Sequence, residues 1–389
     1  MPFASALSTK GNTGEAIREA CGLAKTRSSA PPDLAMLFYS AHHAGEADAL
    51  ARVVYETLSP RALLGCPGEA IVGDDREIER GPAISLWLAR WNEPVQIEPF
   101  QLTMEETSEG YSLLGWPDGL AAADPSRDVV LLLGDPFTFP ADTFLAQVNE
   151  QHAGLRVVGG MASGGREPGS NQMLLGETVV EQGAVGVVLQ GPIKLRTVVS
   201  QGCRPIGQPL VITKARDNLI TELGGKPPMA HLQEIWEKAP QEERELIQQG
   251  LHVGRVINEY QAGFQRGDFL VRNVMGMDRD SGAVAITDRV RVGQTVQFHV
   301  RDAGTASEDL NSLLQHDQSS GQAPAGALLF TCNGRGSRLF GDPHHDAKTV
   351  RSHAGSIPVA GFFAMGEIGP IGQRNFIHGF TASIALFGE

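Results

Sequence analysis

Residues 34–69 decide the fold of this chain. They begin with the apolar run LAMLFY at 34–39, continue through an amphipathic segment at 46–58, and return as ALL at 62–64. The turn GCPGE at 65–69 follows, and an alternating apolar run then occupies 83–89. A strand, a helix and a returning strand most naturally form a right-handed crossover, so this stretch predicts a parallel pair of strands.

A second copy of the plan starts with a predicted strand at 129–133. It passes through a helix opened by Pro140 and returns at 155–158 into the glycine-rich turn GGMASGG at 159–165. A closing strand is predicted at 185–189. The recurrence indicates that the plan is an internal repeat.

A third copy starts with a strand at 327–331, continues into a helix at Asp342–Pro343 that ends at Gly355, and returns at 357–360. A closing strand is predicted at 380–387. The sequence therefore predicts an α/β fold of repeated strand–helix–strand units with mixed sheets. Glycine-rich loops should leave the carboxyl ends of the strands and converge there as a ligand site.

The first and third copies also share Gly-Glu, at Gly68–Glu69 and at Gly366–Glu367. Internal duplication explains this, and so does chance similarity between glycine turns. Both readings are open from the sequence.

The pattern changes between the second and third copies. A surface helix is expected at 232–249 with a break near Pro240, followed by short strands at 269–274, 283–287 and 295–300 that form an antiparallel meander. We place the main boundary near residue 215. The expected domains are an α/β module at 1–214, and a module at 215–389 in which the meander precedes an α/β unit.

Composition excludes several classes of protein. Of the 389 residues, 41% are hydrophobic and 20% are charged, which is not the signature of a disordered chain. The net charge of −13, without a Lys/Arg-rich stripe, argues against a nucleic-acid partner. We find no apolar run long enough to cross a membrane and no signal-peptide pattern, so we expect a cytoplasmic protein with neither a membrane nor a nucleic-acid partner.

The cysteines give little sign of chemistry. They are widely spaced and form no C-x-x-C pair, so neither a metal site nor a disulfide framework is predicted. A cysteine-dependent enzyme is an alternative hypothesis, with Cys332 or Cys66 as nucleophile and His378 or His345 as base. Because no complete catalytic motif is present, we expect no catalytic residue and no enzyme activity.

The densest candidate loop is CNGRG at 332–336, directly after a predicted buried strand. Glycines on both sides of Arg335 let the backbone approach a ligand, and the guanidinium suits a carboxylate or phosphate. Glu367 lies between glycines on the neighbouring loop and could accept an ammonium group. We hypothesise that Arg335 and Glu367 clamp a zwitterionic ligand. The alternative is that Arg335 pairs with an internal carboxylate, which could be Glu367 itself.

Other candidates complete the expected site. His378 beside Gly379 either contacts the ligand or is a half-buried histidine bonded to the backbone. Glu69 could have the same role in the first copy as Glu367 has in the third. The residues predicted to bind the ligand are Cys66, Gly68, Glu69, Gly160, Cys332, Asn333, Arg335, Gly336, Gly366, Glu367 and His378.

Several motifs in order carry a resemblance to a known family. They are LGCPGEAI (64–71), LLGDP (132–136), VVGGMASGG (157–165), QGCRPIG (201–207), LFTCNGRG (329–336) and VAGFFAMGEIGP (359–370). On these motifs the chain resembles the FIST domain proteins, with 1–214 similar to the FIST N module and 215–389 to the FIST C module. The Cys66–Pro67 pair departs from the Cys-Ser or Cys-Thr common there, so a hydroxyl contact is not expected at that turn.

The resemblance implies a sensory domain for small ligands. We therefore expect an intracellular, stand-alone sensor of an amino acid or small carboxylate that signals through a separate output protein. Some members of the family bind haem, which requires an axial histidine. Because no histidine here matches a transferable motif, no cofactor is predicted, and a haem-binding gas sensor is the second alternative.

Overall fold

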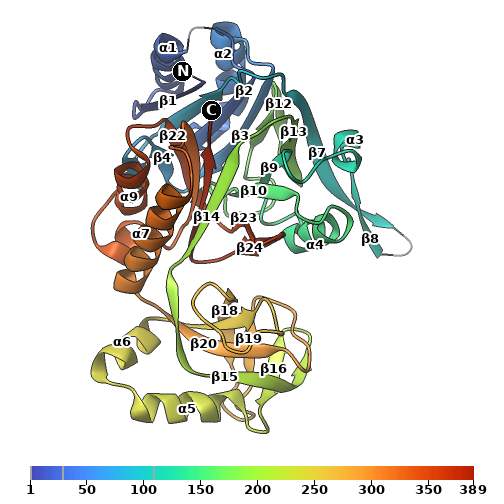
Figure 1. Cartoon of the computed structure of the whole chain (residues 1–389), viewed down its shortest axis with the longest axis vertical. Helices are drawn as coiled ribbons and strands as arrows, with labels where there is room; N and C mark the ends of the chain where they lie inside the picture. Colours follow the sequence, from blue (N-terminus) through green and yellow to red (C-terminus); the bar gives the residue numbers. More distant parts are fainter. Residues whose placement is uncertain (1, 29, 108–109) are drawn as a thin grey trace. The chain divides into compact units, whose positions relative to one another are not determined.

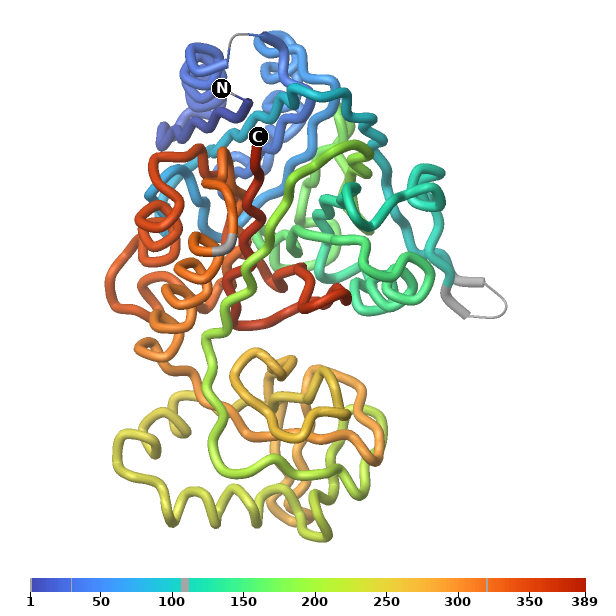
Figure 2. The backbone as a smooth tube through the Cα atoms, viewed as in Figure 1, coloured from blue at the N-terminus to red at the C-terminus, as the bar shows by residue number. Residues whose placement is uncertain are grey.

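The computed structural model describes residues 2–28, 30–107 and 110–389, and Figures 1 and 2 show its course. By internal contacts it forms two compact units, Met1–Val199 with Leu310–Glu389, and Ser200–Asp309. The smaller unit is therefore an insertion in the larger one. These units divide the chain differently from the sequence modules 1–214 and 215–389: residue 214 lies inside strand β15 (Cys203–Arg216), and both modules contribute to the larger unit.

The first repeat of the larger unit confirms the predicted crossover. Strand β2 (Leu34–Ser40), helix α2 (Ala47–Leu58) and strand β3 (Ala62–Gly68) follow one another, and β2 and β3 pair in parallel. Strand β6 (Ile84–Ala89) returns antiparallel to β2. Helix α1 (Thr13–Arg27) precedes the repeat, with the Asn12 side chain accepting from the Glu15 N–H as its N-cap.

The second repeat has the same plan. Strand β9 (Val129–Gly134) pairs in parallel with β10 (Arg156–Met161), and helix α4 (Ala141–Gln151) connects them. Strand β13 (Ala184–Gln190) returns antiparallel to β9. The short helix α3 (Asp118–Ala121) precedes this repeat.

In the third repeat, β21 (Gly326–Cys332) and β22 (Val359–Ala364) pair in parallel around helix α9 (His345–Ala354), and β25 (Thr381–Phe387) returns antiparallel to β21. Helix α7 (Ala303–Ser320) precedes it. The predicted end at Gly355 is confirmed as the C-cap of α9. The predicted start at Asp342–Pro343 is wrong, because His344 takes a left-handed conformation (φ 71°) and delays the helix to the next residue.

Each repeat sends a hairpin into the sheet of another repeat. The first, β4 (Ile71–Gly73) with β5 (Arg76–Ile78), joins β22. The second hairpin joins β3 and consists of β11 (Met173–Leu175) and β12 (Thr178–Val180). The third hairpin joins β10 and consists of β23 (Glu367–Ile371) and β24 (Arg374–His378). The exchange closes a cycle, which ties the three repeats together without long connections.

Three mixed sheets result from this exchange. Their strand orders are β1-β6-β2-β3-β11-β12, β24-β23-β10-β9-β13-β7-β8 and β14-β25-β21-β22-β4-β5. The remaining strands of these sheets are β1 (Phe3–Ser8), β7 (Gln96–Thr107), β8 (Gly110–Leu114) and β14 (Leu195–Gln201). The predicted α/β architecture of repeated units with mixed sheets is confirmed.

One glycine marks the same place in every repeat. Gly65, Gly159 and Gly361 lie in the second strand, between a leucine of the first strand (Leu37, Leu132 and Leu329) and a hairpin residue (Leu174, Ile368 and Val72). A Cβ on each would lie 2.8, 1.8 and 1.8 Å from the carbonyl oxygen of that leucine. Ile368 and Val72 are therefore equivalent hairpin residues. Glu367 and Ile71, which directly precede them, are equivalent as well. The correspondence of Glu367 with Glu69 that the shared Gly-Glu suggested is therefore wrong.

The three sheets turn one face each toward a shared apolar core. Phe38 of the first repeat packs against Phe330 and Phe362 of the third, with ring centroids 6.3 and 5.3 Å apart, and Leu131 of the second repeat belongs to the same cluster. Helices cover the opposite face of each sheet. They are α1 and α2 in the first repeat, α4 in the second, and α7 and α9 in the third. Such a core fixes the loops at the strand ends.

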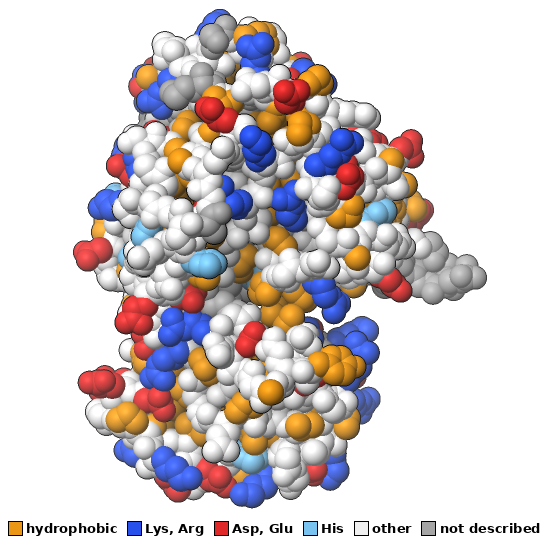
Figure 3. All heavy atoms as spheres, in the orientation of Figure 1, with side chains coloured by type: hydrophobic (Ala, Val, Ile, Leu, Met, Phe, Trp, Pro, Cys, Tyr) orange, Lys and Arg blue, Asp and Glu red, His pale blue; other side chains and the backbone are white. Residues whose placement is uncertain are grey.

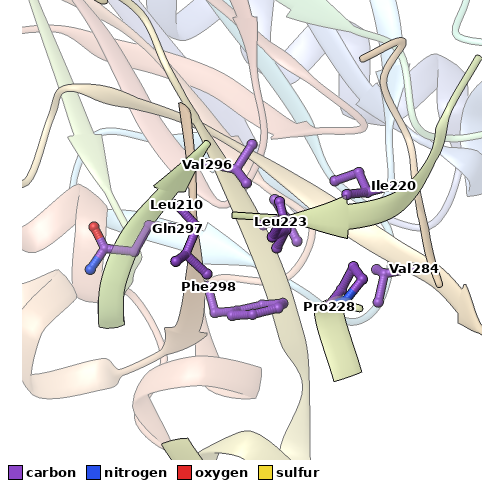
Figure 4. A pocket seen from close by; sticks show the side chains of 9 residues that line it. Leu210, Ile220, Leu223, Pro228, Val284, Val296, Gln297 and Phe298 are labelled. Carbon is purple, nitrogen blue, oxygen red and sulfur yellow. The ribbon is translucent and has the colours of Figure 1, made fainter. Parts of the chain in front are cut away.

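The smaller unit is a closed barrel. Its strand order is β15, β16 (Leu219–Leu223), β19 (Val284–Ile286), β18 (Phe269–Met277), β17 (Leu251–Val256) and β20 (Thr295–Arg301). The three predicted strands are confirmed as β18, β19 and β20, but the predicted meander is wrong, because β20 pairs with β17 and β15 instead of with β19. The helix expected at 232–249 is α5 (Pro228–Lys238) and α6 (Gln241–Gln249), separated at Ala239–Pro240. Its apolar interior, shown in Figure 4, leaves a cavity of only about 10 Å³, the space of one water.

The surface of the larger unit carries charged side chains of both signs, as Figure 3 shows. Basic and acidic side chains are interspersed over the larger unit on the face shown in Figure 3. No helix in the described ranges has the length and apolarity that crossing a membrane requires.

Candidate functional site

A small polar cavity lies where the β21 loop meets the first-repeat hairpin. Its volume is about 90 Å³. The loop after β21 and the single-turn helix α8 (Ser337–Phe340) form one wall. The lining residues are Glu69, Ala70, Glu79, Arg80, Asn333, Ser337, Arg338 and Phe363. They come from distant parts of the sequence, yet all belong to the larger unit.

Opposite charges meet at this cavity. Arg338 Nη2 lies 2.5 Å from Glu69 Oε1, with the two side chains 62% and 41% exposed, and Arg338 Nη1 donates to the Asn333 carbonyl at 3.2 Å. Asn333 Oδ1 is buried and has no hydrogen-bond partner among the described residues. An acceptor left unsatisfied in this way favours a ligand or water that donates to it.

Glu79 fixes the cavity wall. Its carboxylate accepts from the Ser337 backbone N–H at 2.9 Å and from the Ser337 hydroxyl at 2.5 Å. Gly336 takes φ 62°, ψ −147°, and a Cβ there would lie 2.8 Å from both Glu79 Oε1 and the Phe363 ring. The predicted glycine is therefore needed for close approach of the loop to its neighbours.

Arg335 lies in the interior beneath this loop. Its Nε and Nη2 donate to Asp346 Oδ2 and Oδ1 at 2.6 and 2.8 Å, and both side chains are 0% exposed. Thr331 and His345 also bond to the Asp346 carboxylate, at 2.6 and 2.9 Å. Burial alone would raise the pKa of Asp346, but the Arg335 charge and hydrogen bonds outweigh burial and hold that pKa well below its usual range.

Glu367 is also buried, at 0% exposure. Its Oε2 accepts from the Thr381 N–H and hydroxyl at 3.1 and 2.7 Å, and Oε1 has no partner among the described residues. Burial raises the pKa of Glu367 to about 8, and burial together with the Asp346 charge raises the pKa of Glu77 to about 8. Burial thus favours the protonated form of both carboxyls.

These positions correct the clamp hypothesis. Arg335 pairs with an internal carboxylate, as the alternative anticipated, but that partner is Asp346 and not Glu367. The sequence could not identify Asp346 as the partner, because the loop between the two residues brings them together only in the folded protein. The exposed Arg338 and Glu69 instead meet at the cavity.

Other predicted residues serve the packing. Cys66 belongs to the shared core, and burial raises the pKa of its thiol well above the ordinary value. A Cβ on Gly68 would lie 2.8 Å from Phe362, and one on Gly160 would lie 3.1 Å from Ala364. The carbonyl of Gly366 accepts from Met161 N–H at 2.8 Å. These positions let strands approach closely.

The candidate nucleophile and bases make contacts of their own. His378 is buried with Nε2 2.9 Å from the Gly369 carbonyl oxygen, which matches the reading of a histidine bonded to the backbone. His345 Nδ1 faces Asp346. Cys332 is half-buried, and its sulfur accepts from the Gly334 N–H at 3.4 Å. Within the described ranges no cluster of three His, Cys, Asp or Glu could hold a metal.

The structure thus brings together Glu69, Asn333 and Gly336 of the predicted residues. Sequence reasoning missed Glu79, Arg80, Ser337 and Arg338. Arg338 had a signal, because it lies three residues after Arg335, directly beyond the glycine-rich turn. Glu79 and Arg80 had none, since only the hairpin exchange carries them to the third repeat.

Comparison with known proteins agrees with the motifs. The FIST N domain model matches residues 33–226, and the FIST C domain model matches residues 229–370. An uncharacterized protein of Mycobacterium bovis is 44% identical over 377 residues, which cover 96% of this chain and 95% of that protein. A second uncharacterized protein, from Mycobacterium tuberculosis, is 43% identical over 357 residues, covering 92% of this chain and 91% of its own.

Proposed function

Because the chain belongs to the FIST family, a family of sensory domains in signal transduction, we propose that it binds a small zwitterion or carboxylate in the 90 Å³ cavity. An amino acid is the ligand class that fits best, and a separate output protein would receive the signal. The observation that carries the proposal is the ion pair between Arg338 and Glu69 at the cavity.

An exposed ion pair is easily exchanged for a ligand. Pairs of this kind contribute only about 0–1 kcal/mol to stability, so opening the pair costs little. A ligand carboxylate would then bind the Arg338 guanidinium, with Arg80 as a second cation on the cavity wall. A ligand ammonium would bind Glu69 and donate to the buried Asn333 Oδ1. The cavity therefore offers a partner to both ends of a zwitterion.

The volume restricts the ligand. One water needs about 10–15 Å³ of such a volume, so the cavity has room for roughly six to nine waters. Small amino acids and short carboxylates are compounds of this size. The proposal thus favours the small members of the amino-acid class.

Calorimetry and thermal-shift measurements with glycine, alanine, serine, acetate and lactate test the proposal. Arg338→Ala should weaken binding by about tenfold, since it removes one charge-assisted contact. Arg52→Ala is the control, because Arg52 is similarly exposed (59%) and pairs with Asp48 on α2, away from the lining residues. If no compound binds, or if both variants weaken binding equally, the proposal is wrong.

A further inference from the structure

A second and larger cavity lies in the second repeat. Its volume is about 320 Å³, within the range of small-molecule sites. It is formed by the loop after β9, the first turn of α4, the end of β10 and the third-repeat hairpin. The lining residues are Pro136, Phe139, Pro140, Ala141, Asp142, Thr143, Met161, Met365 and Ile377.

This cavity occupies the place that corresponds to the polar cavity of the third repeat. Met161 and Phe363 each lie two residues after the repeat-marking glycine, Gly159 or Gly361, and each lines its cavity. Pro136 and Asn333 each lie four residues after the leucine opposite that glycine. Met365 and Glu69 each lie three residues before the paired hairpin residue, Ile368 or Val72. Three elements of the repeat therefore build both cavities in the same way.

The chemistry of the two cavities is different. Where the polar cavity has Asn333, Phe363 and Glu69, the corresponding residues here are Pro136, Met161 and Met365. The Phe139 ring and Ile377 add further apolar surface. Met365 is 44% exposed, so the cavity is open to an incoming molecule. Its polar side chains are Asp142 and Thr143, both in the first turn of α4.

We propose that this cavity is a second binding site, for a small uncharged aromatic molecule carrying a ring N–H or O–H donor, of the indole or phenol class. Thioether sulfurs and a phenyl ring are favourable neighbours for an aromatic ring. The Asp142 carboxylate and Thr143 hydroxyl provide acceptors for the donor at one side. The same carboxylate repels anions, which opposes binding of the carboxylates expected in the polar cavity.

Titration of the full chain with indole tests the proposal. Met365→Glu puts a charge against the ring and should weaken indole binding by about tenfold or more. Met104→Glu is the matched control, since Met104 in β7 is 43% exposed and lies outside the cavity. Indole binding that survives Met365→Glu unchanged, or no saturable binding to the folded wild-type protein, would overturn the proposal.

Methionine oxidation gives a readout that needs no variant. Mild peroxide oxidises exposed thioethers, so bound indole should slow oxidation of Met365 severalfold and leave Met104 and Met275 unaffected. Equal oxidation of Met365 with and without saturating indole would contradict binding at this place.

The charge of Asp142 provides the specificity test. Indole-3-acetate should bind more weakly than indole, and Asp142→Asn should reduce that difference. A preference for indole-3-acetate in the wild type would contradict the proposed class. Arg338→Ala should leave indole binding intact, so failure of the amino-acid site and failure of this one are distinguishable.

Discussion

Arg335 and Asp346 form a two-point ion pair with both side chains completely buried, at 2.6 and 2.8 Å. The pair joins the loop after β21 to the first turn of α9. Because Asn333 precedes Arg335 on that loop and Arg338 follows it in α8, the interior contact positions residues that line the polar cavity. A stability determinant and the candidate site thus share one loop.

Arg335→Ala should destabilise the protein severely. The change leaves the Asp346 carboxylate buried without its charge partner, and such losses typically cost about 3–5 kcal/mol. Chemical denaturation measures the free energy of unfolding. Arg338→Ala, which breaks an exposed pair, should cost less than about 1 kcal/mol.

A double variant separates charge from packing. Arg335→Met with Asp346→Leu removes both charges and should recover a large part of the loss. The buried pair does not stabilise the fold in this way if Arg335→Ala and Arg338→Ala lower the free energy of unfolding equally. The same conclusion follows if the double variant is no more stable than Arg335→Ala.

Glu367→Gln should change how stability depends on pH. The folded pKa of Glu367 is raised to about 8 by burial, whereas an unfolded glutamate titrates near 4.3. Its protonated form therefore stabilises the fold fully below about pH 4, and this contribution is lost as the pH rises toward 8. The variant cannot ionise, so it should match the wild type below about pH 4 and gain on it steadily as the pH rises. At pH 8.5 it should be more stable than the wild type by about 1 kcal/mol or more. Parallel stability curves from pH 5 to 8.5 would contradict the assignment.

Cys332 should be the thiol that reacts first with a maleimide or disulfide probe in the folded protein. Cys21, Cys66 and Cys203 are buried, and burial raises the pKa of Cys21 to about 12 and that of Cys66 well above its ordinary value. Peptide mass spectrometry after brief labelling at pH 7.5 identifies the modified residue, and Cys332→Ser should abolish it. Rapid native labelling of Cys66 in place of Cys332 would contradict this prediction, and uniformly slow labelling would count against the cysteine-dependent enzyme hypothesis.

The repeat-marking glycine predicts a pair of opposite outcomes. A Cβ on Gly361 would lie 1.8 Å from the Leu329 carbonyl oxygen, so Gly361→Ala must push two strands apart and should cost about 1–3 kcal/mol or more. Gly22→Ala in helix α1 meets no atom within 4 Å and should stabilise the protein by about 0.5–1 kcal/mol. Thermal melts compare them. Equal effects of the two changes would contradict the close strand approach.

The sequence by itself determined the three strand–helix–strand units and the short strands of the barrel, but not the pairing of those strands. Apolar runs such as 34–39 and 129–133, helical spacing in between and glycine turns after the second strand are local patterns, and local sterics and solvation translate them into elements. Prediction failed first at local detail that depends on an unusual conformation. The α9 start is one case, since the left-handed His344 carries no sequence signal.

The tertiary structure alone decided which residues share a site. The hairpin exchange carries Glu69 and Glu79 to the third repeat and Met365 to the second, over distances in sequence that no spacing encodes. It also decided that Arg335 faces Asp346 in the interior while Arg338 faces the cavity. Arg335 stands in the glycine-rich loop and Arg338 in the adjoining helix α8. Only the packing of this segment against α9 and the β4–β5 hairpin buries one guanidinium and leaves the other in solvent.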